Sequence, residues 1–446
     1  MTEITLEEGS TAALFGFGVT GRSVAAALLR RNISVLVFDD NPDDEMKDIA
    51  NGLGVDFIAP AEIGEVEEGV ARADFAVPTP GLPENHVFFE SANRRSIPIV
   101  SEFDLAAWWD ERPIVAITGT NGKTTVTTMV DEMLQQSGIC SAMAGNTDTP
   151  LVLAIDNEET ETLVVEASSF RLSQSQRFKP QVAAWLNFAP DHLDVHKDLE
   201  TYENAKKVIW KNLEATDTAV ANIEDEVVRR SIPPHGSTIT FGLSTGDSRV
   251  ENKHLVVGGN QLLEVSELKL TAPHDILNAL AAATVATAGG ASTEAIHEVL
   301  TSFSGLPHRM TYLGSSEGVG WYNDSKSTTP HSVAAAVQGF ENVILITGGQ
   351  NKGIDLSSLG LLKKHLKSVI AIGEASEEID ETFHNKMPVS IAETMEDAVN
   401  FAYSQSQSGD QVILSPGCAS FDWYKNYKER GNHFSELVNE IVLRQT

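Results

Sequence analysis

Residues 117–125 read ITGTNGKTT, and this short stretch decides how the centre of the chain should fold. It follows an apolar run, 114–118, and precedes a stretch of helical composition, 124–136. A Gly-Lys-Thr sequence between a strand and a helix is typical of a phosphate-binding loop, because backbone N–H groups and the helix dipole favour an anion there. The spacing is unusual, since Gly119 lies three residues before Gly122 where the common pattern has five. The loop alone leaves the nucleotide and the reaction open.

The N-terminal stretch predicts a second nucleotide-binding unit. Strands are expected at 12–15 and 34–38, with a glycine turn at 16–21 and a helix at 23–29 between them. The turn reads Gly-x-Gly-x-x-Gly, and Asp39 follows about 20 residues on, which is the dinucleotide fingerprint. NAD, UDP and FAD all remain open as its ligand.

Strand and helix patterns alternate along the rest of the chain. Further strands are predicted at 162–165, 182–186, 342–347, 368–372 and 411–414, and a buried, nearly all-apolar helix at 277–288. This alternation predicts an α/β protein with mainly parallel sheets. We expect three domains: a Rossmann-like N-terminal domain at 1–110, a central domain of the phosphate-loop type at 111–305, and a Rossmann-like C-terminal domain at 306–446.

Composition narrows the class of protein. The chain has 446 residues, more than one hydrophobic core usually supports, and no segment apolar enough to cross a membrane. Its 63 acidic and 32 basic side chains give a net charge of −31, which would repel nucleic acid. An acidic N-terminus and two cysteines favour the reducing cytoplasm. We expect a cytoplasmic monomer that binds small molecules, without nucleic-acid binding or membrane insertion.

Polar residues follow two predicted strands of the central region. Glu166 comes after the strand at 162–165, where a parallel sheet presents ligand groups, and is a candidate Mg²⁺ ligand. The stretch 187–196, NFAPDHLDVH, follows the next strand and suggests metal binding by hard oxygen ligands. From the residues alone, His196 reads as a surface polar residue, and Lys206 as part of a solvated helix face.

The order of these motifs resembles the Mur ligases of peptidoglycan synthesis from end to end, and most closely their glutamate-adding branch. The resemblance is carried by 118–124 (TGTNGKT), 145–146, 166–170 (EASSF), 187–192, 306–309, 323–326 and 415–426. It implies an ATP-dependent amide ligase in which ATP phosphorylates the carboxylate of UDP-N-acetylmuramoyl-L-alanine. The glutamate amine would then attack the acyl phosphate through a tetrahedral intermediate. ATP, Mg²⁺ and a carbamylated lysine are implied with it.

The resemblance also implies roles for individual residues. Catalytic roles fall to Lys123, His192, Lys206 and Lys326. ATP would be bound by Gly119, Thr120, Asn121, Gly122, Lys123, Thr124, Thr125, Asp275, Arg309 and Asp324. The nucleotide-sugar substrate would be bound by Val19, Thr20, Asp39, Gly81, Asn146 and His192, and glutamate by Thr328, Lys352, Ser420 and Phe421. The implied metal ligands are Thr124, Glu166, His192 and Lys206, the last as its carbamate.

Other functions stay open beside this one. A dinucleotide-dependent oxidoreductase would use the glycine turn at 16–21 but leaves the Lys123 loop unexplained. A nucleotide-hydrolysing switch would use the Lys123 loop without an acyl acceptor. A folylpolyglutamate synthetase would share the ligase chemistry, although the nucleotide-sugar unit at 1–110 argues against it. A ligase that takes L-glutamate fits the same motifs.

Overall fold

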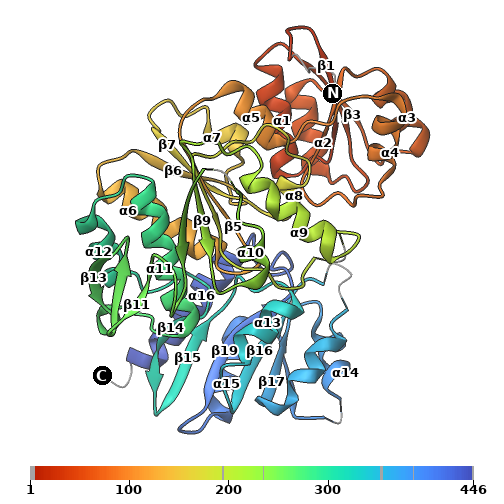
Figure 1. Ribbon diagram of the computed structural model, residues 1–446. Helices are drawn as coiled ribbons and strands as arrows, with labels where there is room; N and C mark the ends of the chain where they lie inside the picture. Colours follow the sequence, from red (N-terminus) through yellow and green to blue (C-terminus); the bar gives the residue numbers. More distant parts are fainter. Residues whose placement is uncertain (1–5, 193–194, 235, 352–354, 385, 444–446) are drawn as a thin grey trace. The chain divides into compact units, whose positions relative to one another are not determined.

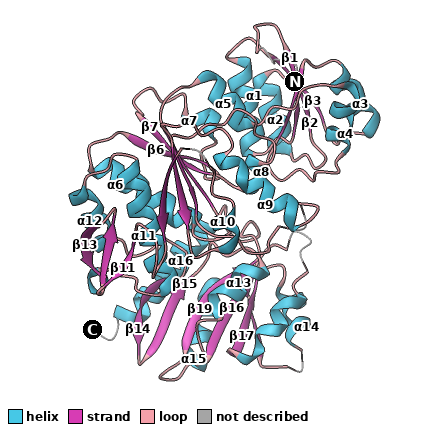
Figure 2. Ribbon diagram, viewed as in Figure 1, coloured by secondary structure: helices cyan, strands magenta, loops and turns pink. Residues whose placement is uncertain are grey.

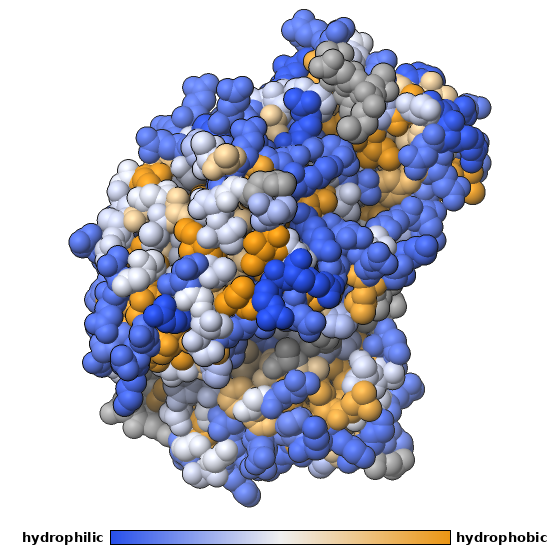
Figure 3. All heavy atoms as spheres, in the orientation of Figure 1, coloured by the Kyte–Doolittle hydropathy of each residue, from blue (hydrophilic) through white to orange (hydrophobic). Residues whose placement is uncertain are grey.

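The computed structural model describes residues 6–192, 195–234, 236–351, 355–384 and 386–443. The chain forms two compact units, Met1–Phe303 and Ser304–Thr446 (Figure 1). Helices and strands alternate through both units (Figure 2), which confirms the predicted α/β class. The surface drawn in Figure 3 is mostly hydrophilic, in keeping with the net charge of −31. In the described part of the chain, no helix has the length and apolar character that a membrane span requires.

The first sheet of the first unit has four parallel strands in the order β3-β2-β1-β4. The strands are β1 (Thr11–Phe15), β2 (Ser34–Phe38), β3 (Asp56–Ile58) and β4 (Phe75–Pro78). The accompanying helices are α1 (Val19–Leu29), α2 (Asp44–Leu53), α3 (Ile63–Ala71), α4 (Val87–Arg95) and α5 (Glu102–Trp109). The strand order reverses between β1 and β4, and ligands of open α/β sheets bind beside such a switch point.

The second sheet has six parallel strands in the order β10-β9-β8-β5-β7-β6. The strands are β5 (Ile114–Thr118), β6 (Ser141–Gly145), β7 (Thr162–Glu166), β8 (Val182–Trp185), β9 (Thr218–Asn222) and β10 (Ser237–Phe241). The helices are α6 (Lys123–Gln136), α7 (Leu151–Ala154), α8 (Ser169–Leu172), α9 (Leu199–Lys207), α10 (Glu226–Arg230), α11 (Pro273–Ala288) and α12 (Thr293–Ser302). Two short 3₁₀ helices are η1 (Val208–Trp210) and η2 (Val265–Glu267). As its composition predicts, α11 is buried from Ala279 to Ala286.

A small antiparallel sheet accompanies this second sheet, and the sequence did not predict it. Its strands are β11 (Arg249–Glu251), β12 (His254–Val257) and β13 (Asn260–Glu264). They are three to five residues long and partly exposed, so they carry little hydrophobic periodicity.

The second unit contains a six-stranded mixed sheet in the order β14-β15-β19-β16-β17-β18. Its strands are β14 (Thr311–Ser316), β15 (Val319–Asn323), β16 (Val343–Gly348), β17 (Leu366–Ile372), β18 (Val389–Ala392) and β19 (Gln411–Gly417). Its helices are α13 (Pro330–Val337), η3 (Ser357–Lys364), α14 (Ser376–Phe383), α15 (Met395–Gln405) and α16 (Tyr427–Leu443). Of the strand pairs described in this sheet, only β14–β15 is antiparallel.

One hydrophobic cluster spans the two sheets of the first unit. Buried residues of β1, α5, α7, β5 and β8 belong to the same apolar cluster. The predicted boundary at 110/111 falls inside this unit, between α5 and β5, and the boundary at 305/306 lies two residues from the division at Phe303/Ser304. The three-domain assignment stays a prediction.

Candidate active site

The phosphate loop connects β5 to α6 at the carboxyl edge of the second sheet. Gly122 precedes α6 with φ of +82°, a conformation that glycine adopts freely. A Cβ on Gly122 would come within 2.5 Å of Asn278 Oδ1, so a larger residue would also clash. The first turn of α6 contains no acidic residue. Its free N–H groups and dipole are therefore available to an anion.

Asn187 holds this loop in place, a role that the sequence analysis missed. Its Oδ1 accepts hydrogen bonds from the backbone N–H groups of Thr120 and Asn121, at 3.0 and 2.9 Å, and its Nδ2 donates to the Asn121 carbonyl at 3.1 Å. Asn187 lies just after β8, which is the neighbour of β5. A polar residue at the carboxyl end of an adjacent parallel strand was the signal that could have identified it.

Lys206 is buried against the loop, so the expectation of a solvated position is wrong. Its exposed fraction is 1%, and its Nζ donates to the Gly119 carbonyl oxygen at 2.8 Å. Lys123 Nζ donates to the same oxygen at 3.0 Å. Burial, and then the nearby Lys123 charge, hold the pKa of Lys206 well below its usual value, while Asp191 opposes the shift. The neutral amine of Lys206 is therefore favoured.

Glu166, at the end of β7, is buried and only half satisfied. Asn146 Nδ2 donates to its Oε1 at 2.9 Å, whereas its buried Oε2 has no hydrogen-bond partner among the described residues. Those residues contain no group of three or more His, Cys, Asp and Glu side chains placed to hold a metal ion. Mg²⁺ often binds through one or two carboxylates together with substrate phosphates. The unpartnered oxygen of Glu166 fits that kind of site.

The two histidines of the segment after β8 have different environments. His192 is half-buried, with Nε2 3.6 Å from Asp191 Oδ2 and its ring against Phe170. His196 is only 2% exposed, so the surface position expected for it is wrong. Its Nε2 lies 2.9 Å from Ser169 Oγ, and the Phe170 ring stacks against it at 5.5 Å. Its contacts with Ser169 and Phe170 of α8 bury the His196 ring.

The glycine turn after β1 packs closely against the loop after β4. A Cβ on Gly16 would lie 2.0 Å from Thr79 Oγ1, so the close approach requires glycine. Asp39 Oδ2 accepts the Phe17 N–H at 2.7 Å and fixes the turn. The other predicted nucleotide-sugar residues lie at this edge too: Val19 and Thr20 in the first turn of α1, and Gly81 in the loop after β4.

A mainly apolar pocket lies beside the phosphate loop in the first unit. Its lining includes Thr125 and Asp275, two of the predicted ATP residues, together with Met129, Leu270 and Leu300. Apolar walls with one carboxylate are suited to a nucleotide base, whose faces are apolar and whose edge carries donors.

In the second unit, Asp324 is buried at the end of β15. Ser415 Oγ donates to its Oδ2 at 2.7 Å, and the Met310 N–H donates to its Oδ1 at 3.1 Å. Burial raises the pKa of Asp324 to about 6, although these donors and Arg309 pull the pKa down. Arg309 itself is exposed.

Three of the predicted glutamate residues line one pocket of the second unit: Thr328, Ser420 and Phe421. Lys352, the fourth, lies outside the described residues. Tyr427 lines the same pocket, and Lys326 Nζ lies 5.9 Å from the centre of its ring. The predicted residues of the phosphate loop therefore lie with Glu166 and Lys206 at the carboxyl edge of the second sheet. The predicted residues of the second unit lie near the carboxyl ends of β15 and β19.

Comparisons with known proteins show the family of this chain. The model of the Mur ligase middle domain matches residues 117–286, and that of the Mur ligase glutamate ligase domain matches 308–418. A UDP-N-acetylmuramoylalanine--D-glutamate ligase of Desulfosudis oleivorans is 35% identical, with 97% of each chain covered. One of Bdellovibrio bacteriovorus is 33% identical, with 96% of each covered.

Solved structures show the same fold at lower identity. The MurF ligase of Thermotoga maritima in complex with ADP is 16% identical, with a TM-score of 0.57, and covers 99% of this chain and 96% of its own. The UDP-N-acetylmuramate-alanine ligase MurC of the same organism is 20% identical, with a TM-score of 0.56, over 97% and 99%. This protein belongs to the Mur ligase family, whose members are ATP-dependent amide ligases.

Proposed function

We propose that this protein joins D-glutamate to UDP-N-acetylmuramoyl-L-alanine with hydrolysis of ATP to ADP and phosphate. The observation that carries the proposal is the carboxyl edge of the second sheet, where the N-terminus of α6, Lys123, Lys206 and Glu166 come together. Full-length relatives named for this reaction support the choice of substrates.

The chemistry requires an activated carboxylate, because an amine cannot displace oxide from a free carboxylate. A carboxylate oxygen of the alanyl group attacks the terminal phosphorus of ATP, and ADP leaves. The glutamate amine then attacks the acyl carbon, forming a tetrahedral intermediate that expels phosphate as the nitrogen loses a proton. The α6 N–H groups and Lys123 hold the phosphates and stabilise the charge that develops on them. Lys326 would contact the transferring phosphate.

Mg²⁺ fits at Glu166 Oε2, with Thr124 and His192 as the further ligands that we propose. When bound, it neutralises phosphate charge and polarises the transferring group. Lys206 would join this set as a carbamate, since its lowered pKa provides the neutral amine that reacts with CO₂. That reaction would convert the buried amine into an anionic oxygen ligand.

The pocket of Thr328, Ser420 and Phe421 is proposed for glutamate, with Lys352 as its cation. The pocket of Thr125 and Asp275 is proposed for adenine, and the glycine turn with Asp39 and Gly81 for the uridine nucleotide. Asn146, which donates to Glu166, and His192 would lie along the acyl group. We also propose that the protein is a cytoplasmic monomer.

The test is ADP release by the purified protein with Mg-ATP and UDP-N-acetylmuramoyl-L-alanine, in parallel with D-glutamate, L-glutamate and no amino acid. Release that depends on D-glutamate is expected. Release with L-glutamate alone would keep the mechanism and change the amino-acid substrate. No release with either isomer would contradict the proposal and favour a folate ligase or a nucleotide-hydrolysing switch.

A further inference from the structure

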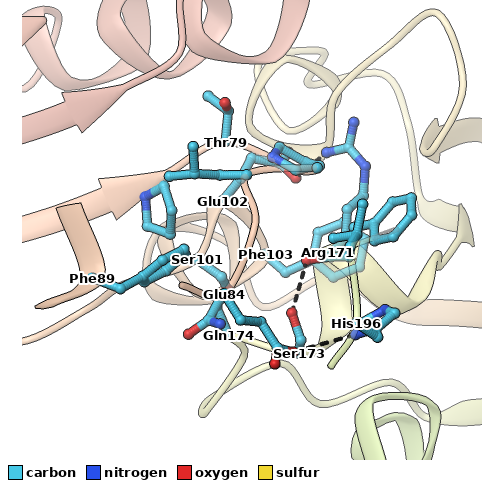
Figure 4. Close-up of a pocket in the computed structure, with 16 residues that line it drawn as sticks. Thr79, Glu84, Phe89, Ser101, Glu102, Phe103, Arg171, Ser173, Gln174 and His196 are labelled. Carbon is cyan, nitrogen blue, oxygen red and sulfur yellow. Dashed lines mark hydrogen bonds and ion pairs between the residues drawn. The ribbon is translucent and has the colours of Figure 1, made fainter. Parts of the chain in front are cut away.

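The first unit contains a pocket at the carboxyl end of β4 (Figure 4). The glycine turn that follows β1 packs against Thr79 of its lining. The lining of this pocket includes Thr79, Gly81, Glu84, Glu102, Arg171 and His196. β1 and β4 are the strands between which the sheet order reverses, the usual place for a nucleotide in an open α/β sheet. Arg171 lies on α8, which follows β7 of the second sheet, whereas β1 and β4 belong to the first sheet.

The Arg171 guanidinium is buried and incompletely satisfied. Its side chain is 6% exposed; Nη1 donates to Glu102 Oε2 at 2.6 Å, and Nη2 donates to Thr20 Oγ1 at 3.0 Å. Its buried Nε has no acceptor among the described residues. A guanidinium has five N–H donors, so this side chain retains donors for a ligand.

Arg171 differs from the other residues of this pocket in its permanent positive charge. Among the described residues that line the pocket, it is the one arginine or lysine. The arginine of α1, Arg22, already donates to the Phe17 carbonyl and pairs with Glu45 at 3.0 Å. In a chain of net charge −31, an anion bound here depends on local donors. The 11-residue helix α1 has no acidic residue in its first turn, and Thr20 of that turn contacts Arg171, so the anion-favouring end of α1 lies next to this guanidinium.

We propose that Arg171 binds the diphosphate of the nucleotide-sugar substrate, with Glu102 and Thr20 orienting its guanidinium. This inference rests on the proposed function and adds a binding residue that the sequence motifs did not supply. Arg171 lies five residues after Glu166 along the chain. A phosphate contact at Arg171 would therefore place the diphosphate of the substrate close in sequence to Glu166, the proposed metal ligand. It would also favour the binding of diphosphates over that of uncharged nucleosides.

The test compares the affinity of the full-length protein for UDP and for uridine by isothermal titration calorimetry. Arg171→Gln alone leaves the buried Glu102 carboxylate without its cation, so the decisive variant is Arg171→Gln with Glu102→Gln, which replaces the ion pair by two amides. The matched control is Arg177→Gln, which removes an exposed arginine that stacks on Trp108 outside the pocket.

We expect the double variant to bind UDP about tenfold or more weakly than the unaltered protein, from the loss of charge-assisted hydrogen bonds, with uridine affinity unchanged. Arg177→Gln should change neither affinity. Equal UDP affinity in the double variant and the unaltered protein would overturn the inference, as would an equal loss for UDP and uridine. If the unaltered protein releases ADP with D-glutamate while the double variant keeps its UDP affinity, only the inference fails. If the unaltered protein neither binds UDP nor releases ADP, the proposed function fails with it.

Discussion

Lys123 Nζ and Lys206 Nζ donate hydrogen bonds to one acceptor, the Gly119 carbonyl oxygen, at 3.0 and 2.8 Å. Two ammonium groups that share an acceptor repel each other, and burial of one of them increases the cost. The repulsion can be relieved by an anion in the loop or by loss of charge at Lys206. The arrangement is therefore suited to bind phosphate and to keep Lys206 neutral.

Lys123→Ala should abolish ADP formation while leaving UDP binding nearly intact. The phosphate loop and the glycine turn belong to different sheets, so the loss should be confined to ATP chemistry. We expect the rate of ADP release to fall by roughly 10²-fold or more, as for other groups that stabilise transition-state charge. The control is Lys211→Ala, which removes an exposed lysine. Equal loss of ADP release and UDP affinity would contradict the assignment of the two sites.

Lys206 should carry a carbamate, and Lys206→Arg should remove it. Burial and the Lys123 charge lower the pKa of Lys206, which increases the share of neutral amine that can react with CO₂, whereas a guanidinium stays protonated. Protein equilibrated with ¹³C-bicarbonate should show a carbamate signal by NMR. Ligase activity should decrease as the pH is lowered, because protonation of the amine removes the group that reacts with CO₂. Lys207→Arg, next to it on α9 and paired with Glu203 at 2.6 Å, should keep both signal and activity. A signal that persists in Lys206→Arg would disprove the assignment.

The sequence predicts the strands at 34–38 and 114–118 with the bounds that the structure has, because they are apolar runs between turn residues. It predicts the phosphate loop and the buried helix α11 for similar local reasons. The burial of Lys206 was not predictable from the residues alone, because it depends on a contact with Gly119, 87 residues away along the chain. His196 is buried for the same kind of reason, through Ser169 and Phe170. Contacts across the fold decide these positions, and local polarity does not reveal them.

Asn187→Ala should weaken ATP binding without unfolding the protein. It removes the acceptor of two loop N–H groups and so frees the loop between β5 and α6. Each hydrogen bond is worth about 1 kcal/mol, so we expect the KM for ATP to rise roughly 5- to 30-fold. Steady-state kinetics would measure this, with Asn212→Ala as the control because Asn212 donates to the Gln176 carbonyl, away from the loop. An unchanged KM for ATP would mean that the loop keeps its shape without this support.

Asp324→Asn should stabilise the protein at alkaline pH while weakening nucleotide turnover. Burial raises the folded-state pKa of Asp324 from 3.8 to about 6. The folded state therefore binds the proton more tightly than the unfolded state. The unfavourable contribution of the carboxylate is absent below about pH 4 and grows to its full value above about pH 6. Asparagine, which is never charged, should remove a cost of at most about 3 kcal/mol at pH 8, a value offset in part by altered hydrogen bonds to Ser415.

The measurement is the free energy of unfolding from urea denaturation at pH 8 and pH 5. At pH 5 the native Asp324 is already largely protonated, so the advantage of Asp324→Asn should shrink to roughly half. Asp380→Asn on α14 is the matched control, because it removes the same charge from a less buried position. Steady-state ADP release should fall in Asp324→Asn if the carboxylate also contacts ATP, as we propose. A stability difference that is the same at both pH values would mean that the ionisation of Asp324 does not set it.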